Sequence, residues 1–175
     1  MQKKFSYPVK IDELNQQEYV FHLDADVDEL ADIKDILQVE DVKNFVADIR
    51  LKLNLREHLL RVWGNVQAEL ELKSVITLNN FTKKYGADFN LIYDTAATYR
   101  DIREMNAGIN DEVPDIIEGG VINLADIVLE QIALQMEDYP RAEGEVFDFS
   151  AYGFETTDDK EDKTHPFAVL AKLKK

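Results

Sequence analysis

The sequence predicts an α+β protein, in which an antiparallel meander of about four to six strands packs against two or three helices in a single domain. Two observations lead to this fold class. Between residues 45 and 78 apolar and polar side chains alternate, which is the period of strands with one face in water. The apolar segment at 121–139 instead has the period of a helix.

The N-terminal part is predicted to contain one strand and one helix. The strand is FSYPVKI at 5–11, and Pro8, which has no backbone N–H, places it at the edge of a sheet. The helix spans 24–37, with Asp26 or Asp28 as its N-cap.

The central meander is defined by two runs of opposite phase. The first run has apolar residues at odd positions: Phe45, Ala47, Ile49, Leu51, Leu53 and Leu55. The second has them at even positions: Leu60, Val62, Val66, Ala68, Leu70 and Leu72, continuing through Ile76 and Leu78. Gly64 indicates a bulge or bend, and a further strand is expected at 88–93. Connections this short favour antiparallel pairing.

The remaining segments complete a domain at 1–152. Residues 94–120 are predicted to be an acidic irregular loop with some helix. A helix begins after Asn123, a good N-cap, and ends near Tyr139, because Pro140 disfavours helix at the residue before it. A flexible segment is expected at 153–164 and a short helix at 165–175.

Composition excludes several kinds of chemistry. The 175 residues contain no cysteine, so disulfides, thiol catalysis and iron–sulfur clusters are excluded. The N-terminus has no apolar region typical of a secretory signal, and no window approaches a membrane span, so a cytoplasmic protein without membrane contact is expected.

Charge is unevenly distributed along the chain. The net charge is −15, and residues 101–158 carry Arg103 and Arg141 as their basic side chains against 15 acidic ones. Such a segment repels phosphate, which disfavours extensive RNA binding through it and favours a basic partner protein. The alternative is that the acidity only keeps the protein soluble.

No motif indicates catalysis or a resident metal or cofactor. DADVDELADIKD at 24–35 begins like a calcium loop, but Glu29 replaces the required glycine and Asp35 the final glutamate. His22, His58 and His165 are widely separated, and the chain has neither a phosphate-binding glycine loop nor a nucleophile elbow. We therefore expect no enzyme, cofactor or metal.

Two groups of residues are candidate interaction surfaces. The first is Arg50, Lys52 and Arg56 on the polar face of one strand, with Arg61 and Lys73 following on the next. These side chains form either an ordinary solvated face or a small basic patch where RNA phosphates dock, although Asp48, Glu57, Glu69 and Glu71 dilute the patch.

The second candidate surface is Tyr139, Pro140, Arg141 and Gly144, which follow the predicted helix. They form either a simple helix stop and turn or a recognition knob, since Tyr and Arg are favoured at interaction hot spots.

Four ordered blocks resemble the YceD family, the large ribosomal RNA subunit accumulation proteins, in the form found in alphaproteobacteria. They are FSYPVKIDEL at 5–14, VWGNVQAELELKSVITLNNF at 62–81, EGGVINLADIVLEQIALQMEDYPRAEG at 118–144 and HPFAVLAKLKK at 165–175. The third block resembles the family signature at Gly119, Gly120, Leu124, Glu130, Gln131, Leu134, Tyr139, Pro140, Arg141 and Gly144. Ser74 stands where many members have cysteine, and Asn123 where aspartate is usual.

The resemblance implies a non-enzymatic role in the synthesis, processing or stability of 23S ribosomal RNA and in large-subunit biogenesis. Basic ribosomal or assembly proteins are the expected partners, with direct contact to 23S RNA left open. Two alternatives also remain open: a metal-dependent nuclease or hydrolase using the acidic loop at 101–118, and a general acidic adaptor protein.

Overall fold

Two β-sheets and two helices make up the part of the chain that the computed structural model describes, residues 5–97 and 115–146. In chain order the elements are β1 (Pro8–Lys10), a 3-10 turn (Ile11–Glu13), β2 (Glu18–Asp24), α1 (Val27–Leu37), β3 (Asp41–Asn54), β4 (Leu59–Lys73), β5 (Asn80–Asp94), β6 (Asp115–Ile116), a second 3-10 turn (Glu118–Gly120), β7 (Val121–Asn123) and α3 (Leu124–Ala133). The chain divides into two compact units, residues 1–143 and 144–175, and all these elements belong to the first.

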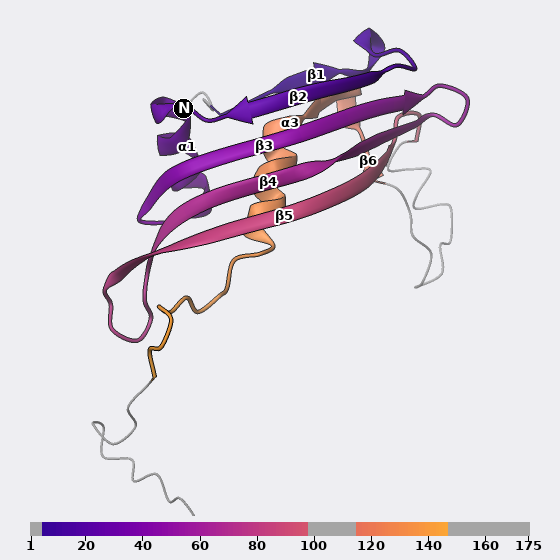
Figure 1. Ribbon diagram of the computed structural model, residues 1–175. Helices are drawn as coiled ribbons and strands as arrows, with labels where there is room; N and C mark the ends of the chain where they lie inside the picture. Colours follow the sequence, from indigo (N-terminus) through magenta and orange to yellow (C-terminus); the bar gives the residue numbers. More distant parts are fainter. Residues whose placement is uncertain (1–4, 98–114, 147–175) are drawn as a thin grey trace, which may run out of the picture. The chain divides into compact units, whose positions relative to one another are not determined.

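The main sheet has the strand order β2-β3-β4-β5-β6 (Figure 1). Strands β2 to β5 pair antiparallel as a meander, whereas the short β6 pairs parallel with β5. Strands β1 and β7 form a separate two-stranded antiparallel sheet, so Pro8 does lie in an edge strand. The predicted α+β class is confirmed.

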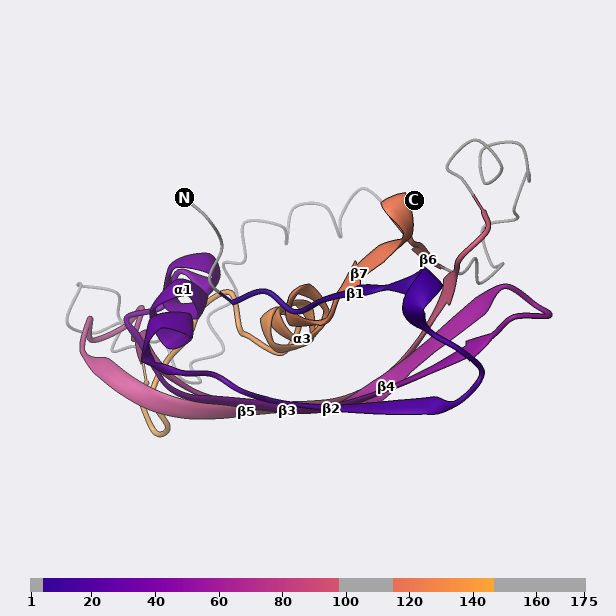
Figure 2. The ribbon, with the colours of Figure 1, turned by 90° about the horizontal axis from the view of Figure 1, so that it is seen from above.

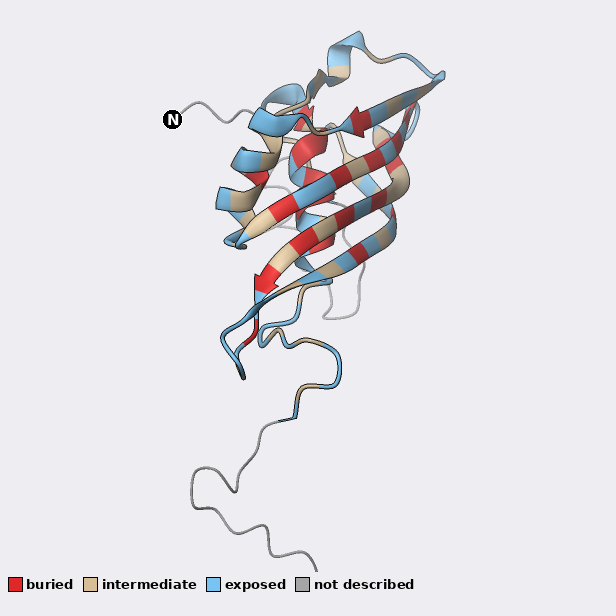
Figure 3. Ribbon diagram, turned by 60° about the vertical axis from the view of Figure 1, so that its left-hand side comes forward, coloured by how far each residue is buried: buried red, intermediate tan, exposed pale blue. Residues whose placement is uncertain are grey.

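The phase change between the two long strands comes from the turn that joins them. Leu53 pairs with Leu60, so inward positions are odd in β3 and even in β4. The same inversion occurs in the next hairpin, where Leu72 pairs with Phe81. The alternating burial is visible along each strand in Figure 3.

All the other described elements lie on one side of the main sheet. Figure 2 shows α1, α3 and the β1–β7 pair above its inner face, with no described element below the outer face. Helix α3 is buried over most of its circumference, through Leu124, Ala125, Ile127, Val128, Leu129 and Ile132. The apolar area that this helix and the inner face bury together is the main source of stability.

Asparagine 123 fixes where α3 begins. Its side-chain oxygen accepts hydrogen bonds from the backbone N–H of Ala125 (3.3 Å) and of Tyr7 (2.8 Å). Its amide nitrogen donates to the Asp126 carboxylate over 2.8 Å. The predicted N-cap is therefore confirmed, and it also ties α3 to the N-terminal segment.

Helix α1 begins with a capping box at Asp26, which is one of the two predicted N-caps. Asp26 accepts from the Glu29 backbone N–H (2.9 Å), and the Glu29 carboxylate accepts from the Asp26 N–H (3.0 Å). The helix starts at Val27 and not at residue 24, because Asp24 still pairs with β3. In the calcium-like motif, Asp24 is therefore the last residue of β2 and Asp26 is the N-cap of α1. Both residues have a structural role.

Several predicted boundaries are wrong, each for an identifiable reason. Strand β2 was not predicted, because the outward Val20 hides the alternation of its inward residues. Residues 74–79 form a turn and not a continued strand, so β5 starts at Asn80. Helix α3 ends at Ala133, six residues before Tyr139, because Gln135 and Met136 turn back on Ile132 and Ala133 with tighter hydrogen bonds.

Other predicted segments lie outside the described residues. These include most of the loop at 94–120, the segment at 153–164 and the helix at 165–175; the described part of the loop contains β6 and a 3-10 turn. Among the described residues, no helix is long and apolar enough to cross a bilayer.

Gly64 marks a close approach of two strands and not the predicted bulge. Pairing is continuous across it, and the register shift in β3 lies instead between Val42 and Asn44. A Cβ atom built on Gly64 would lie 1.9 Å from the carbonyl oxygen of Asp48. Only glycine fits there without movement of the backbone.

We therefore predict that Gly64→Ala lowers the free energy of unfolding by about 3 kcal/mol, because β3 and β4 must separate to admit the methyl group. Gly86→Ala is the matched control in β5, since its Cβ would meet nothing nearer than 3.6 Å. That control should change stability by less than about 1 kcal/mol. Urea denaturation of the three proteins measures both effects, and equal losses in the two variants would contradict the close-approach explanation.

Candidate functional site

The outer face of the main sheet carries a cluster of cations at one end. We call this cluster, Arg50, Lys52, Arg56 and Arg61 together with Trp63, the basic end. Its residues come from β3, from the turn at 55–58 and from the start of β4. The register places Lys52 opposite Arg61 and Arg50 opposite Trp63, so the side chains stand in two adjacent rows.

The three predicted cations of this surface are brought together at that end. Lys52 and Arg56 line a hollow of about 600 Å³, and Arg61 lines it as well. Arg50 lies in the neighbouring row and pairs with Glu18 of β2 over 3.3 Å. These cations therefore lie together on one surface, whereas Lys73 lies at the far end of β4.

Trp63 is the member of the basic end that the sequence reasoning missed. Its ring lies 5.1 Å from the Arg61 guanidinium carbon, within cation–π range. The Arg61 Nε donates to the Asn90 side-chain oxygen over 2.7 Å, which fixes the guanidinium beside the ring. The missed signal was an aromatic residue at an outward position of β4.

The second candidate surface lies after α3, at the opposite end of the sheet. We call Tyr139–Arg141 the corner. The Val75 N–H, in the β4–β5 turn, donates to the Pro140 carbonyl over 2.9 Å. Tyr139 is 78% exposed, so the turn presents this ring to solvent and does not bury it.

Glu137 holds the start of the corner against β5. Its carboxylate accepts from the Lys83 ammonium group and, over 3.2 Å, from the Tyr85 hydroxyl. The hydrogen bond from Lys83 is the main cause that lowers the pKa of Glu137 below its usual 4.5. Burial, reinforced by the Glu137 charge, raises the pKa of Tyr85 to about 12.

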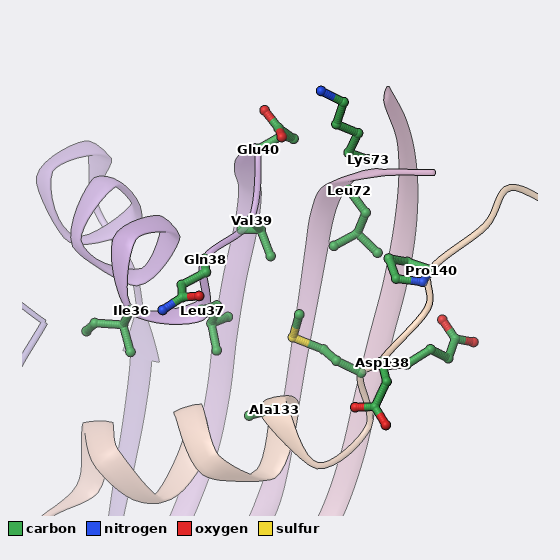
Figure 4. A pocket seen from close by; sticks show the side chains of 12 residues that line it. Ile36, Leu37, Gln38, Val39, Glu40, Leu72, Lys73, Ala133, Asp138 and Pro140 are labelled. Carbon is green, nitrogen blue, oxygen red and sulfur yellow. The ribbon is translucent and has the colours of Figure 1, made fainter. Parts of the chain in front are cut away.

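A hollow of about 530 Å³ lies beside the corner, and we call it the corner groove. Its apolar lining comes from the end of α1 and the link to β3, from the end of β4, and from the end of α3 with the segment after it: Ile36, Leu37, Val39, Leu72, Ala133, Met136 and Pro140. Glu40, Glu137 and Asp138 stand around this lining with a single cation, Lys73. Figure 4 shows Pro140 beside Leu72 at one side of the groove.

The two candidate surfaces are not one site. The basic end lies at the β3–β4 turn and the corner at the β4–β5 turn, so the whole length of β4 separates them. For its fifteen residues this is about 46 Å along the strand. Gly144, with φ of +82°, belongs to the second compact unit.

Ser74 organises the β4–β5 turn. It is buried, and its hydroxyl accepts from the backbone N–H of Ile76 (3.1 Å) and of Thr77 (3.3 Å). Serine hydroxyls commonly cap turns in this way. The residue therefore supports the turn to which the corner is bonded.

Residues for metal chemistry are not gathered in the part of the chain described. No group of three or more histidine and acidic side chains within 5–97 and 115–146 is arranged to hold an ion. His22 contacts Asp48 over 2.8 Å on the outer face, and His58 lies in the β3–β4 turn. Most of the acidic loop at 101–118 and His165 lie outside the described residues.

The described residues form an α+β fold with its helices on one face of the main sheet and a candidate contact surface at each end of that sheet. The family model for the large ribosomal RNA subunit accumulation protein YceD matches residues 62–174. Because this match covers more than half of the 175 residues, the chain belongs to the YceD family. No curated protein and no solved structure matches the chain.

The matched region contains the whole corner but only Trp63 of the basic end. It begins one residue before Trp63 and includes the corner, whereas β1, β2, α1 and β3 precede it. The description of the family connects the chain with the RNA of the large ribosomal subunit.

The Glu137 contacts generate a prediction about acid stability. A carboxyl group whose pKa is lowered by folding stabilises the folded state above its unfolded pKa, near 4.5, and this stabilisation disappears as pH falls through the folded pKa. We predict that Glu137→Gln is less stable than the natural protein at about pH 7, and that the difference shrinks as pH falls below 4.5. Urea denaturation at about pH 7 and at a series of lower pH values measures it, and a difference that stays constant in acid would contradict the charge-assisted contact.

Proposed function

We propose that the protein is a non-enzymatic factor that supports the synthesis, processing or stability of 23S ribosomal RNA and the assembly of the large ribosomal subunit. One observation carries this proposal: within residues 5–97 and 115–146, a member of this family presents an acidic apolar groove and a sheet face that no described helix covers. Such a molecule acts by holding other molecules together. We place it in the cytoplasm, where ribosomes are assembled.

The corner groove supplies the main contact in this proposal. Its apolar lining offers a place for an apolar side chain. Its charged lining is Glu40, Glu137, Asp138 and Lys73, and because Glu137 pairs with Lys83 the local charge is −1. A basic segment of a ribosomal or assembly protein complements both properties. The exposed Tyr139 and Arg141 extend the contact beyond the groove, as residue types that are frequent in interface hot spots.

The net charge of −15 supports protein contact over extensive RNA contact. A protein that relies on RNA phosphates for affinity needs many cations along the path of the strand. The acidic groove offers a basic protein attraction at a distance, which speeds association more than it strengthens the final complex.

The proposal predicts an RNA phenotype. Depletion of the protein in the organism that encodes it should lower the ratio of 23S to 16S RNA, measured by electrophoresis of total RNA. An unchanged ratio would contradict the proposed function. Tight binding of purified protein to 23S fragments with a steep salt dependence, as expected for about six or more phosphate contacts, would contradict the protein-contact mechanism.

The groove itself is tested by charge reversal. Glu40→Lys with Asp138→Lys should abolish co-sedimentation with large-subunit precursors, because both substitutions repel a basic segment. Asp12→Lys with Asp88→Lys makes the same change in net charge away from the groove and should co-sediment normally. If both double variants behave alike, the groove is not the contact.

A further inference from the structure

The basic end combines an aromatic ring, planar cations and exposed apolar side chains on one open surface. Trp63 is the single tryptophan of the chain and is partly exposed on the outer face. In its row the register aligns Val20, Arg50, Trp63 and Asn90, and in the adjacent row Glu18, Lys52, Arg61 and Ile92. Val20 is 65% exposed and Ile92 46%, so apolar surface extends to both sides of the ring.

The cations of this surface are largely available. Lys52 and Arg56 form no ion pair with any residue in 5–97 and 115–146, and Arg61 is engaged by the neutral Asn90. Arg50 pairs with Glu18. Glu57 also lines the hollow, and its carboxylate accepts a hydrogen bond from the Asn54 side chain over 2.6 Å. The four cations exceed these two carboxylates, which gives a local excess of +2 in a chain of net charge −15.

We propose that the basic end binds a short single-stranded segment of RNA. One base stacks on the surface made by Trp63 and the Arg61 guanidinium, and a neighbouring phosphate enters the hollow lined by Lys52, Arg56 and Arg61. Open sheet faces with aromatic residues bind single strands in this way, since bases stack on aromatic rings and on guanidinium planes alike. The choice of RNA over DNA rests on the proposed function.

The surrounding charges limit the length of the bound segment. The next row across the sheet contains Asp48 and Asp88, and Glu69 and Glu71 follow further along β4. The strand must therefore cross the sheet from β2 to β5, over three strand spacings or about 14 Å. That width accommodates about two or three nucleotides of an extended strand, far less than a duplex reader spans.

The sign of the charge separates this surface from the corner groove. A basic ribosomal protein is attracted to the groove and repelled by the basic end, whereas an RNA phosphate has the opposite preference. The two surfaces, on opposite ends of β4, would allow one protein to hold a basic polypeptide and an adjacent RNA strand together.

The single tryptophan makes the test direct. An oligouridine of about six nucleotides should quench Trp63 emission in the full chain, because a base stacks on the ring. With about three phosphates neutralised, log K should fall against log salt with a slope of about −2, well below that of an extensive RNA binder.

Variants then locate the site by anisotropy of fluorescein-labelled RNA. Trp63→Ala should weaken binding between about fivefold and about 150-fold, and Trp63→Phe should retain most of it. Arg61→Gln should reduce the salt slope by about 0.7. Lys84→Gln is the matched control, an exposed cation on the same face whose partner is Glu69 at 3.6 Å, and it should bind normally.

Three results would overturn the inference. They are no quenching up to about 1 mM RNA, equal losses for Trp63→Ala and Lys84→Gln, and capture of an acidic protein that competes with RNA at the basic end. Urea denaturation shows whether Trp63→Ala folds as the natural protein does. If its denaturation curve differs, Trp63→Phe and Arg61→Gln are used instead, because they keep a large side chain at each position.

The outcome is distinguishable from that of the proposed function. If depletion lowers the 23S to 16S ratio but RNA does not quench Trp63, this inference is wrong and the proposed function stands. If RNA binds as expected but depletion leaves the ratio unchanged, the proposed function is wrong while the single-strand site remains.

Discussion

Burial of α3 against one face of the main sheet is the interaction on which the rest of the structure depends. The helix presents apolar residues to the inner face, to α1 and to the N-terminal strand at once, and Asn123 fixes its start to that strand. Because both described helices lie on this side, no described helix or strand covers the outer face (Figure 2). The end of α3 also determines where the corner begins, since Glu137 and Pro140 bond to the β4–β5 hairpin directly afterwards.

This one-sided arrangement separates two kinds of surface by charge. The corner groove has apolar walls with an excess of carboxylates, and the basic end has an aromatic ring with an excess of cations. A long strand, β4, connects them rigidly. Under the proposals made above, the acidic groove would contact a basic protein and the basic end an RNA strand.

The long strands and the helices could be predicted from the sequence, because an element that buries one face has apolar residues at the spacing of a strand or of a helix. The phase of β3 and β4, the Asp26 and Asn123 caps and the α+β class are examples. Strand β2 was not predicted, because Val20 is apolar and faces outward. The turn at Ser74 was not predicted either, because the alternation of apolar and polar residues continues through it. The alternation pattern alone does not show whether an apolar residue lies in a strand or in the turn that follows it.

The candidate surfaces were predictable in part. Arg50, Lys52 and Arg56 follow from strand phase, but the place of Trp63 beside Arg61, and Asn90 as their anchor, depends on pairing with β5. The corner groove joins residues from four separate segments and has no signature in the order of the residues.

Footprinting by hydroxyl radicals is the most direct test of the central claim that the protein is a docking platform with two contact surfaces. When the protein is bound to large-subunit precursors, Trp63 and Tyr139 should both be protected from oxidation. Val27, which is 83% exposed on α1, should remain as reactive as in the free protein. Protection of Val27 with Trp63 and Tyr139 unchanged would contradict the account.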